Sequence, residues 1–380
     1  MEQMNILDTP PSRALTDFLY TTASRMRIPL SGTFELSPVC NFSCRMCYVR
    51  KTPQEVRCSS RGILTLEDWR RIAREARDAG MLYLLLTGGE PLLWPDFWTL
   101  YDELIDMGFI ISINTNGSLI DDRAVAHFRK KPPQKISLTL YGAGDATYKR
   151  LCGADGVFSR VDRAIRSLSE AGITVKLNCS LTPDNGQDLD WIMQYGRERD
   201  LSLAVSSYMF PPVRRDPSMV GRNERFTPEE AADYDMRYAA FGRSEQTYHR
   251  YLRRILEGCA DPPGLDESCV DPVDGKIRCR AGKASFWVTW DGWMTPCGMM
   301  PEPRVDVKDQ SFTQAWNELT EVSAALRLSG LCETCPDRNV CHPCAAIALA
   351  ETGTTEGIPR YKCRITRAKY EIAKNTLDKA

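Results

Sequence analysis

The segment that decides the fold reads Met81-Leu82-Tyr83-Leu84-Leu85-Leu86-Thr87 and continues directly into Gly88-Gly89-Glu90-Pro91. Its first seven residues form an apolar run of strand length, and the glycines and the proline end that run in a turn. Upstream, Thr65 and Asp68 form a capping-box pattern, and apolar residues at helical spacing lead to Gly80. The sequence therefore predicts a helix that leads into a buried strand and a glycine-rich turn.

The same alternation of strand and helix extends in both directions. Strands are expected at 33–37, 81–87, 109–114, 135–140, 173–180 and 201–207, with stretches of helical period between them. This pattern predicts an α/β fold, a partial (β/α)6 TIM-type barrel whose ligands bind at the carboxyl ends of the strands.

The chain of 380 residues is long enough for more than one domain. We expect an N-terminal extension over 1–32, the barrel core over 33–208, and a linker with a bridging helix over 209–267. A loop-rich, cysteine-rich C-terminal domain over 268–370 and a tail over 371–380 complete the expected organisation.

Composition excludes several classes of partner and compartment. Lys and Arg number 49 against 50 Asp and Glu, so no broad charge favours nucleic acid or an anionic membrane. No apolar run approaches the roughly 20 residues of a membrane helix, and the N-terminus lacks the pattern of a secretory signal. We therefore expect a cytoplasmic protein, in which clustered cysteines indicate metal sites rather than disulfides. Fifteen cysteines against three histidines favour iron-sulfur clusters over zinc.

Three cysteines, Cys40, Cys44 and Cys47, follow the first expected strand within one short loop. Three thiolates so placed could bind three irons of a four-iron cluster and leave the fourth iron open. A zinc site, or a coincidence of cysteines, is the alternative for this loop taken alone. The turn 88–91 follows the neighbouring strand, so both motifs are expected at the same end of the barrel.

The cysteine triplet together with Gly88-Gly89-Glu90-Pro91 resembles the radical S-adenosylmethionine (SAM) superfamily. The resemblance implies that the open iron chelates the amino and carboxylate groups of the methionine moiety of SAM. It further implies that an electron, from a flavodoxin- or ferredoxin-type reductant, cleaves SAM to a 5′-deoxyadenosyl radical that abstracts a substrate hydrogen.

Residues expected to contact SAM can be named from the same resemblance. The glycines would allow close approach of the backbone to the ligand, and Glu90 would accept a hydrogen bond from the methionine ammonium. Asn116 and Ser137 would lie near the ribose or adenine, and Arg150 would approach the SAM carboxylate. Turn formation for Asn116 and a surface ion pair for Arg150 are open alternatives, and no residue is assigned as a catalytic acid or base.

The C-terminal cysteine pattern is similar to the SPASM domain, which carries two auxiliary [4Fe-4S] clusters. The resemblance implies that one auxiliary cluster is bound by Cys269, Cys279, Cys297 and Cys344, and the other by Cys332, Cys335, Cys341 and Cys363. If Cys269 is not a ligand, the first auxiliary cluster keeps an open iron, and two zinc knuckles are the alternative for the whole set. Of the four remaining cysteines, Cys152, Cys179 and Cys259 are expected to be packed thiols, and Cys58, on the loop after the triplet, is the exception.

Radical SAM enzymes with this C-terminal domain mostly modify peptides or proteins, so the resemblance favours oxidative modification of a peptide, such as a crosslink. Sulfatase-type maturation ranks lower, because Gly298 follows Cys297 where sulfatase maturases carry an aspartate. The alternatives are the same chemistry on a small molecule, and a non-catalytic electron-transfer or metal-binding module. Only residues 1–32 precede the first expected strand, so no leader-binding domain is expected. Either a separate protein reads a leader peptide, or the substrate is recognised through the mouth of the barrel and the linker that follows it.

Overall fold

The computed structural model describes residues 11–258, 277 and 279–379, and its centre is a nine-stranded sheet in the order β6-β5-β4-β3-β2-β1-β7-β8-β9. The first six strands are parallel neighbours, and each begins and ends within two residues of its expected bounds. The expected α/β class is thereby confirmed, with an open rather than closed sheet. The strands are β1 (Ser31–Glu35), β2 (Tyr83–Thr87), β3 (Ile110–Thr115), β4 (Lys135–Thr139), β5 (Val175–Ser180) and β6 (Ser202–Ser206).

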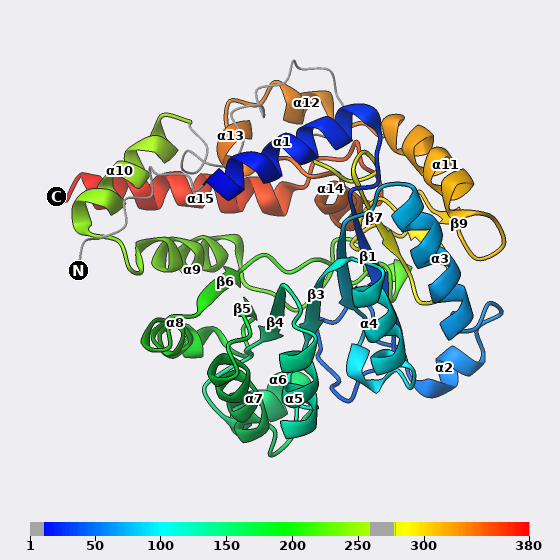
Figure 1. Cartoon of the computed structure of the whole chain (residues 1–380). Helices are drawn as coiled ribbons and strands as arrows, with labels where there is room; N and C mark the ends of the chain where they lie inside the picture. The colour runs from blue at the N-terminus through cyan, green and yellow to red at the C-terminus, as the bar shows by residue number, and fades with distance from the viewer. Residues whose placement is uncertain (1–10, 259–276, 278, 380) are drawn as a thin grey trace.

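One face of this sheet is covered by the helices that connect the parallel strands (Figure 1). Phe34 of β1 packs against Trp69 of α3 with ring centroids 4.8 Å apart, and both side chains are fully buried. The connecting helices are α2 (Pro53–Arg57), α3 (Leu66–Asp78), α4 (Phe97–Asp106), α5 (Asp122–Lys130), α6 (Asp145–Cys152), α7 (Phe158–Glu170) and α8 (Leu189–Glu198).

The helix α3 forms as its sequence predicts. The Thr65 side chain accepts a hydrogen bond from the Asp68 amide, and Asp68 in turn accepts one from the Thr65 amide, which completes the capping box. The apolar positions at helical spacing are all buried, and Gly80 ends the helical segment with a φ of +103°.

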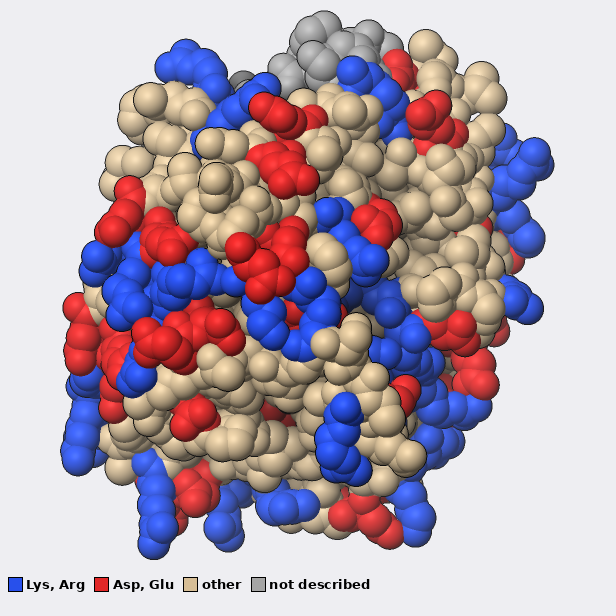
Figure 2. Space-filling view, turned by 90° about the vertical axis from the view of Figure 1, so that its right-hand side faces the viewer, with Lys and Arg blue, Asp and Glu red and all other residues tan. Residues whose placement is uncertain are grey.

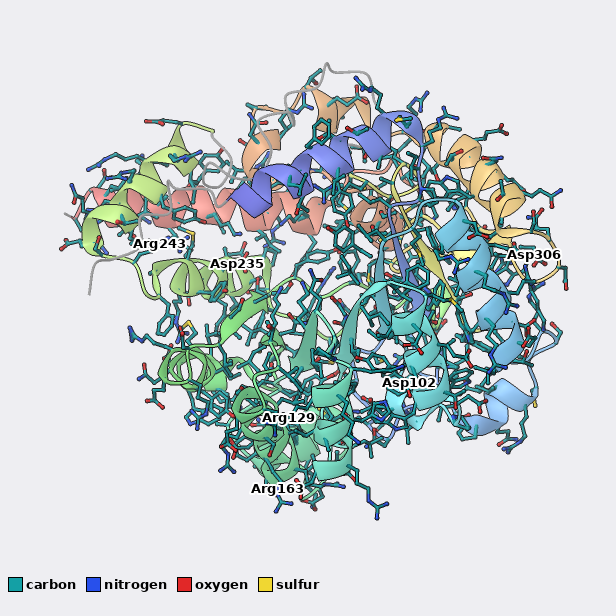
Figure 3. All side chains as sticks on the ribbon, in the orientation of Figure 1. Asp102, Arg129, Arg163, Asp235, Arg243 and Asp306 are labelled. Carbon is teal, nitrogen blue, oxygen red and sulfur yellow. The ribbon has the colours of Figure 1, made fainter. Side chains whose placement is uncertain are left out.

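The C-terminal region extends the same sheet rather than standing apart from it. β7 (Ser285–Val288) pairs in parallel with β1, and β8 (Trp293–Thr295) and β9 (Val305–Asp306) follow as antiparallel strands. The ion pair between Arg61 and Asp306, 2.9 Å apart, holds β9 against the segment before α3 (Figure 3). The helices of this region are α11 (Phe312–Ala324), α12 (Gly330–Glu333), α13 (Arg338–Cys341), α14 (Ala345–Thr352) and α15 (Arg360–Leu377).

The bridging helix expected to run on to about residue 258 is two helices, α9 (Pro228–Ala240) and α10 (Glu245–Leu256). Gly242 separates them with a φ of +76°, a conformation that favours glycine. Both helices pack against α15, where Lys369 pairs with Asp235 of α9 at 2.5 Å (Figure 3). The tail expected at 371–380 is therefore helical to Leu377, because Ala373 is fully buried in this contact.

α1 (Pro11–Met26) and α15 lie on the side of the sheet away from the connecting helices, whereas α11 packs on α3 (Figure 1). Within the expected extension 1–32, Ala23 of α1 and Leu30 pack on Ala284. Figure 2 shows acidic and basic side chains interspersed over one side of the molecule, with no large area of one sign. None of the helices in the described ranges is both long and apolar enough to span a bilayer.

Candidate functional site

Cys40, Cys44 and Cys47 lie on the loop after β1, at the carboxyl end of the parallel strands. The Phe42 amide donates to Cys40 Sγ and the Arg50 amide donates to Cys47 Sγ, each at 3.3 Å. Burial, with smaller contributions from nearby negative charges that include the other two thiols, raises the pKa of Cys40 to about 12. The three thiols are therefore neighbours in a loop largely shielded from water.

Of the three cysteines, Cys44 has the surroundings that most favour the ionised thiolate. Hydrogen bonds from Cys152 and Tyr141 lower its pKa, although burial acts in the opposite direction. Arg50 contributes a nearby positive charge, and its buried Nε has no hydrogen-bond partner. Cys152 is fully buried, as expected of a packed thiol, but its contact with Cys44 was not predicted. A metal-bound thiolate fits this surrounding of donors and positive charge.

The turn after β2 packs directly on this cysteine loop. The Gly89 amide donates to Ser37 O at 2.7 Å, and the Glu90 amide donates to Val39 O at 3.0 Å. A Cβ atom on Gly88 would lie 2.4 Å from Ser37 O, and one on Gly89 would lie 2.4 Å from Val39 O. The two glycines therefore allow the two loops to meet, a reason that differs from the expected approach to a ligand.

Glu90 is a buried residue whose carboxylate links the ends of β2 and β3 through hydrogen bonds. Its carboxylate accepts hydrogen bonds from the Leu92 amide at 3.2 Å, the Thr115 hydroxyl at 2.7 Å and the Asn116 amide at 2.8 Å. Burial raises its pKa to about 7, against the effect of these hydrogen bonds. Three of the roughly four acceptor positions of a carboxylate are thus occupied, and one is left for a ligand ammonium. Pro91 is buried and begins a short 3₁₀ turn.

Asn116 connects the end of β3 to the cysteine loop. Its side-chain amide donates to Asn41 Oδ1 at 2.9 Å and approaches Cys40 Sγ at 3.7 Å. Its carbonyl oxygen accepts from the Ser118 amide and hydroxyl at 2.9 and 2.7 Å. The structure therefore brings Asn116 to the thiols, where it orders both the turn and the loop.

Ser137 and Arg150, the two other residues expected to contact SAM, lie in different parts of the structure. Ser137 on β4 lines a cavity inside the sheet. Arg150 on α6 donates through Nε to the Asp184 carbonyl at 3.0 Å and through a second nitrogen to the Thr147 hydroxyl at 3.3 Å. Its guanidinium is engaged by the loop after β5, and the helix α6 that carries it contacts the cysteine loop, where the Ser43 amide donates to the Cys152 carbonyl at 2.7 Å.

A second group of thiols consists of Cys279, Cys297 and Cys344. Burial raises the pKa of Cys297 to about 11, and the charges of Cys344 and Cys279 add to that effect. The pKa of Cys344 is raised mainly by burial, and the charge of Cys279 adds to that effect. Cys269, the fourth ligand that the resemblance implies, lies outside the described residues.

A third group consists of Cys332, Cys335, Cys341 and Cys363. The charges of Cys363, Cys341 and Cys335 add to burial in raising the pKa of Cys332. Cys341 and Cys344 are only three residues apart but belong to different groups, because the chain reverses between them at His342, which has a left-handed φ of +51°. These are the two sets into which the resemblance divides the C-terminal cysteines.

The spacing of the thiols distinguishes a cluster from a single ion. Within the described ranges, no three His, Cys, Asp or Glu side chains converge as the ligands of one metal ion would. In a four-iron cluster each thiolate binds a different iron, so the ligands surround a volume rather than a point. All three groups consist of cysteine thiols, which are the usual ligands of iron-sulfur clusters.

A cavity of about 670 Å³ runs along strands β1 to β5. Near the carboxyl ends of the strands its lining includes Asn114 and Asn178. At the other end it includes Cys279 and Cys297, because β8 runs antiparallel and returns the chain beside the first residue of β7. Two thiols of the second group therefore line the cavity, whereas Cys40, Cys44 and Cys47 do not belong to its lining.

A buried ion pair, which the sequence did not reveal, lies beside this cavity. Glu35, at the end of β1, has 0% of its side chain exposed and accepts two hydrogen bonds from Arg214 at 3.0 Å. The Trp287 indole donates to the same carboxylate at 2.9 Å, and Arg214 also donates to Gly298 O at 2.8 Å. The Arg214 guanidinium stacks over the Tyr48 ring at 5.7 Å. The pair thus connects the loops that carry Cys47 and Cys297.

Comparison with known proteins identifies the class of enzyme. Residues 34–195 match the radical SAM superfamily. The chain is 26% identical over 331 residues to an AdoMet-dependent heme synthase of Methanosarcina barkeri, covering 84% of this chain and 92% of that protein. It is 31% identical over 279 residues to a probable GTP 3′,8-cyclase of Saccharolobus islandicus, covering 72% of this chain and 84% of that protein. The chain belongs to the radical SAM superfamily.

The fold is similar to that of a solved structure over almost the whole chain. Streptococcus suis SuiB, bound to the precursor peptide SuiA, aligns with a TM-score of 0.66 and 17% identity, covering 96% of this chain and 84% of that one. Membership of the superfamily implies SAM and one four-iron cluster, and Cys40, Cys44 and Cys47 lie within the matched residues. These three thiols, Glu90 and Asn116 are the described residues best arranged to hold that pair of cofactors.

Proposed function

We propose that this protein is a radical SAM enzyme with a SPASM-type C-terminal domain, and that it oxidatively modifies a peptide. The observation that carries the proposal is the cavity along strands β1 to β5, whose lining includes two thiols of the second group, Cys279 and Cys297. A substrate in this cavity would have a source of radicals at one end of the strands and an electron acceptor at the other. Two auxiliary clusters, bound by the second and third thiol groups, would complete a set of three.

The protein residues position and shield the chemistry. Gly88 and Gly89 hold the turn after β2 against the cysteine loop, and the Glu90 carboxylate fixes the end of β3 beside it. Cys40, Cys44 and Cys47 would hold the four-iron cluster, which together with SAM would supply the radical that abstracts a hydrogen atom from the substrate. Asn116 orders the loop that holds Cys40, and the buried surroundings of the thiols exclude water from this reaction.

A peptide substrate is supported by the likeness of fold to SuiB, whose solved structure holds its precursor peptide. In the proposed reaction, loss of a hydrogen atom from carbon is followed by loss of a proton and an electron as the new bond forms. Cys279, Cys297 and Cys344 would hold an auxiliary cluster, which would accept that electron. A flavodoxin- or ferredoxin-type protein would supply the first electron, and the substrate would be recognised either by a separate leader-binding protein or at the mouth of the barrel.

A second candidate function is the same chemistry on a small molecule. It is favoured by the AdoMet-dependent heme synthase of Methanosarcina barkeri, because the alignment covers 92% of that protein. A cavity of about 670 Å³ also falls in the size range of small-molecule sites. The two candidates share the three clusters and SAM, so they differ only in the substrate.

The radical SAM reaction is tested with anaerobically reconstituted protein, dithionite and SAM. We expect 5′-deoxyadenosine from the wild type and from the control Cys58→Ala, whose exposed thiol lies outside the three groups. The variant C40A/C44A/C47A should produce none while it keeps the iron of the two auxiliary clusters. Turnover by the triple variant, or zinc in place of iron at these cysteines, would contradict the proposal.

The substrate is tested with a short peptide encoded beside the gene. Loss of two hydrogens from that peptide, measured by mass spectrometry, supports oxidative crosslinking. An unchanged peptide, in a reaction that still forms 5′-deoxyadenosine, favours the small-molecule candidate.

A further inference from the structure

Positive charge without matching negative charge lines the cavity. Among the described residues, its lining includes Lys135, Lys176 and Arg280 and no aspartate or glutamate. Arg280 has partners, since it lies 3.7 Å from Asp17 and stacks over the Tyr20 ring. Neither lysine has a hydrogen-bond acceptor or a carboxylate partner within the described part of the chain. The cavity therefore holds two partly buried lysines whose countercharge is not supplied by the described residues of its lining.

The two lysines come from neighbouring strands. Lys135 is the first residue of β4 and Lys176 is the second residue of β5, so both lie toward the amino ends of the strands. In the register of the sheet, Lys135 lies beside Ser112 of β3, and Lys176 lies beside Ser137 of β4. Each ammonium thus has a hydroxyl group on the adjacent strand, and all four residues line the cavity.

Polar groups that carry no charge continue this lining toward the first thiol group. Asn114 lies beside Ser137 in the register, and Asn178 lies two residues beyond Lys176 on the same strand. Hydroxyl and amide groups hydrogen-bond to an anion without adding charge, whereas each ammonium group favours an anion electrostatically. A site of this composition discriminates between a carboxylate and its uncharged amide.

We infer that the cavity binds the substrate through a carboxylate group, which lies between Lys135 and Lys176. This inference rests on the proposed function, because it assigns the chemical class of the substrate for the same site. In a peptide substrate the carboxylate belongs to an acidic side chain close to the modified residue. The two lysines then set the depth at which the substrate enters the cavity, and so which carbon faces the first thiol group.

The inference is tested by binding, without turnover. Calorimetry on the reconstituted protein uses three probes: an Asp- and Glu-containing heptapeptide, the same peptide with Asn and Gln, and free glutarate. The variant K135M/K176M removes both charges, and Lys130→Met, at an exposed position on α5, is the matched control. Iron content and circular dichroism establish that each variant is folded and loaded.

The wild type and the control should bind the acidic peptide at least about tenfold more tightly than its amide analogue, as hydrogen bonds to charged groups allow. The double variant should lose this preference, and added salt should weaken it in the wild type. Tight binding of glutarate with no peptide binding would support the carboxylate site but contradict a peptide substrate. Equal binding of the acidic and amide peptides, or an unchanged preference in the double variant, would overturn the inference. Formation of 5′-deoxyadenosine is unaffected by either result, so failure here is distinct from failure of the radical SAM assignment.

Discussion

Replacing Arg214 by methionine is expected to destabilise the protein by about 3–5 kcal/mol, because it removes the counterion of a buried carboxylate. The Glu35 side chain is 0% exposed and receives two guanidinium hydrogen bonds at 3.0 Å. After the substitution only the Trp287 indole, at 2.9 Å, still donates to it. A single neutral donor does not replace both water and a cation around an ionised carboxylate.

Urea unfolding of anaerobically prepared samples, followed by tryptophan fluorescence, measures this loss. With a slope of about 3 kcal/mol per molar urea, the midpoint should fall by roughly 1–1.7 M. The matched control is Arg237→Met, which breaks a pair with Asp190 whose side chains are 40% and 72% exposed. Solvent screens such a pair, so its removal should cost about 0–1 kcal/mol.

The double variant E35L/R214M separates the unpaired charge from the loss of packing. Without the carboxylate nothing charged is left buried, so the double variant should be more stable than Arg214→Met alone. The reasoning is refuted if Arg214→Met lowers the midpoint no more than the Arg237→Met control does. It is also refuted if the double variant is the less stable of the two.

Three further predictions concern the first thiol group. Burial raises the pKa of Glu90 from 4.5 to about 7, so the folded protein keeps a proton that the unfolded chain releases. Stability should therefore fall as the pH rises from about 4.5 to 7, and Glu90→Gln should flatten this slope in urea unfolding. Cys152→Ala removes a hydrogen bond to the Cys44 sulfur and should lower the midpoint potential of that cluster in an EPR-monitored titration. Gly89→Ala would put a Cβ 2.4 Å from Val39 O, so it should reduce iron loading and 5′-deoxyadenosine formation and cost about 1–3 kcal/mol.

Each of these predictions has a control and a contrary result. Gly144→Ala has open space around its Cβ, so equal iron loss in that variant would remove the argument from loop contact. The control for Cys152→Ala is Cys179→Ala, which deletes a buried thiol that is not a hydrogen-bond partner of Cys44. An equal shift in midpoint potential in both variants would show that the hydrogen bond from Cys152 is unimportant. An unchanged pH slope in Glu90→Gln would mean that another group titrates in this range.

The barrel core could be predicted because its signals are local. The capping box at Thr65, the apolar face of α3 and Gly80 all lie within one helix and its ends. Each parallel strand is a short apolar run between such helices, so its position follows from the pattern of the chain. The turn 88–91 and the cysteine loop meet because both follow parallel neighbouring strands.

The parts that could not be predicted depend on contacts between distant segments. Glu35 and Arg214 are separated by 179 residues, and nothing in either neighbourhood indicates the other. Cys44 and Cys152 are likewise far apart in the sequence, and neither neighbourhood indicates their contact. In the C-terminal region, metal ligands replace much of the apolar periodicity on which such predictions rest, so its short helices α12 and α13 were not expected.

The pairing of β7 with β1 has a consequence for how this protein can be divided. If the chain were cut after the barrel, β1 would lose its neighbour along residues 31–34 and present unpaired amides and carbonyls to the solvent. Such an exposed edge invites pairing with other chains and aggregation. The two halves of the sequence are therefore expected to fold as one cooperative unit, and an attempt to express the barrel alone should give insoluble material.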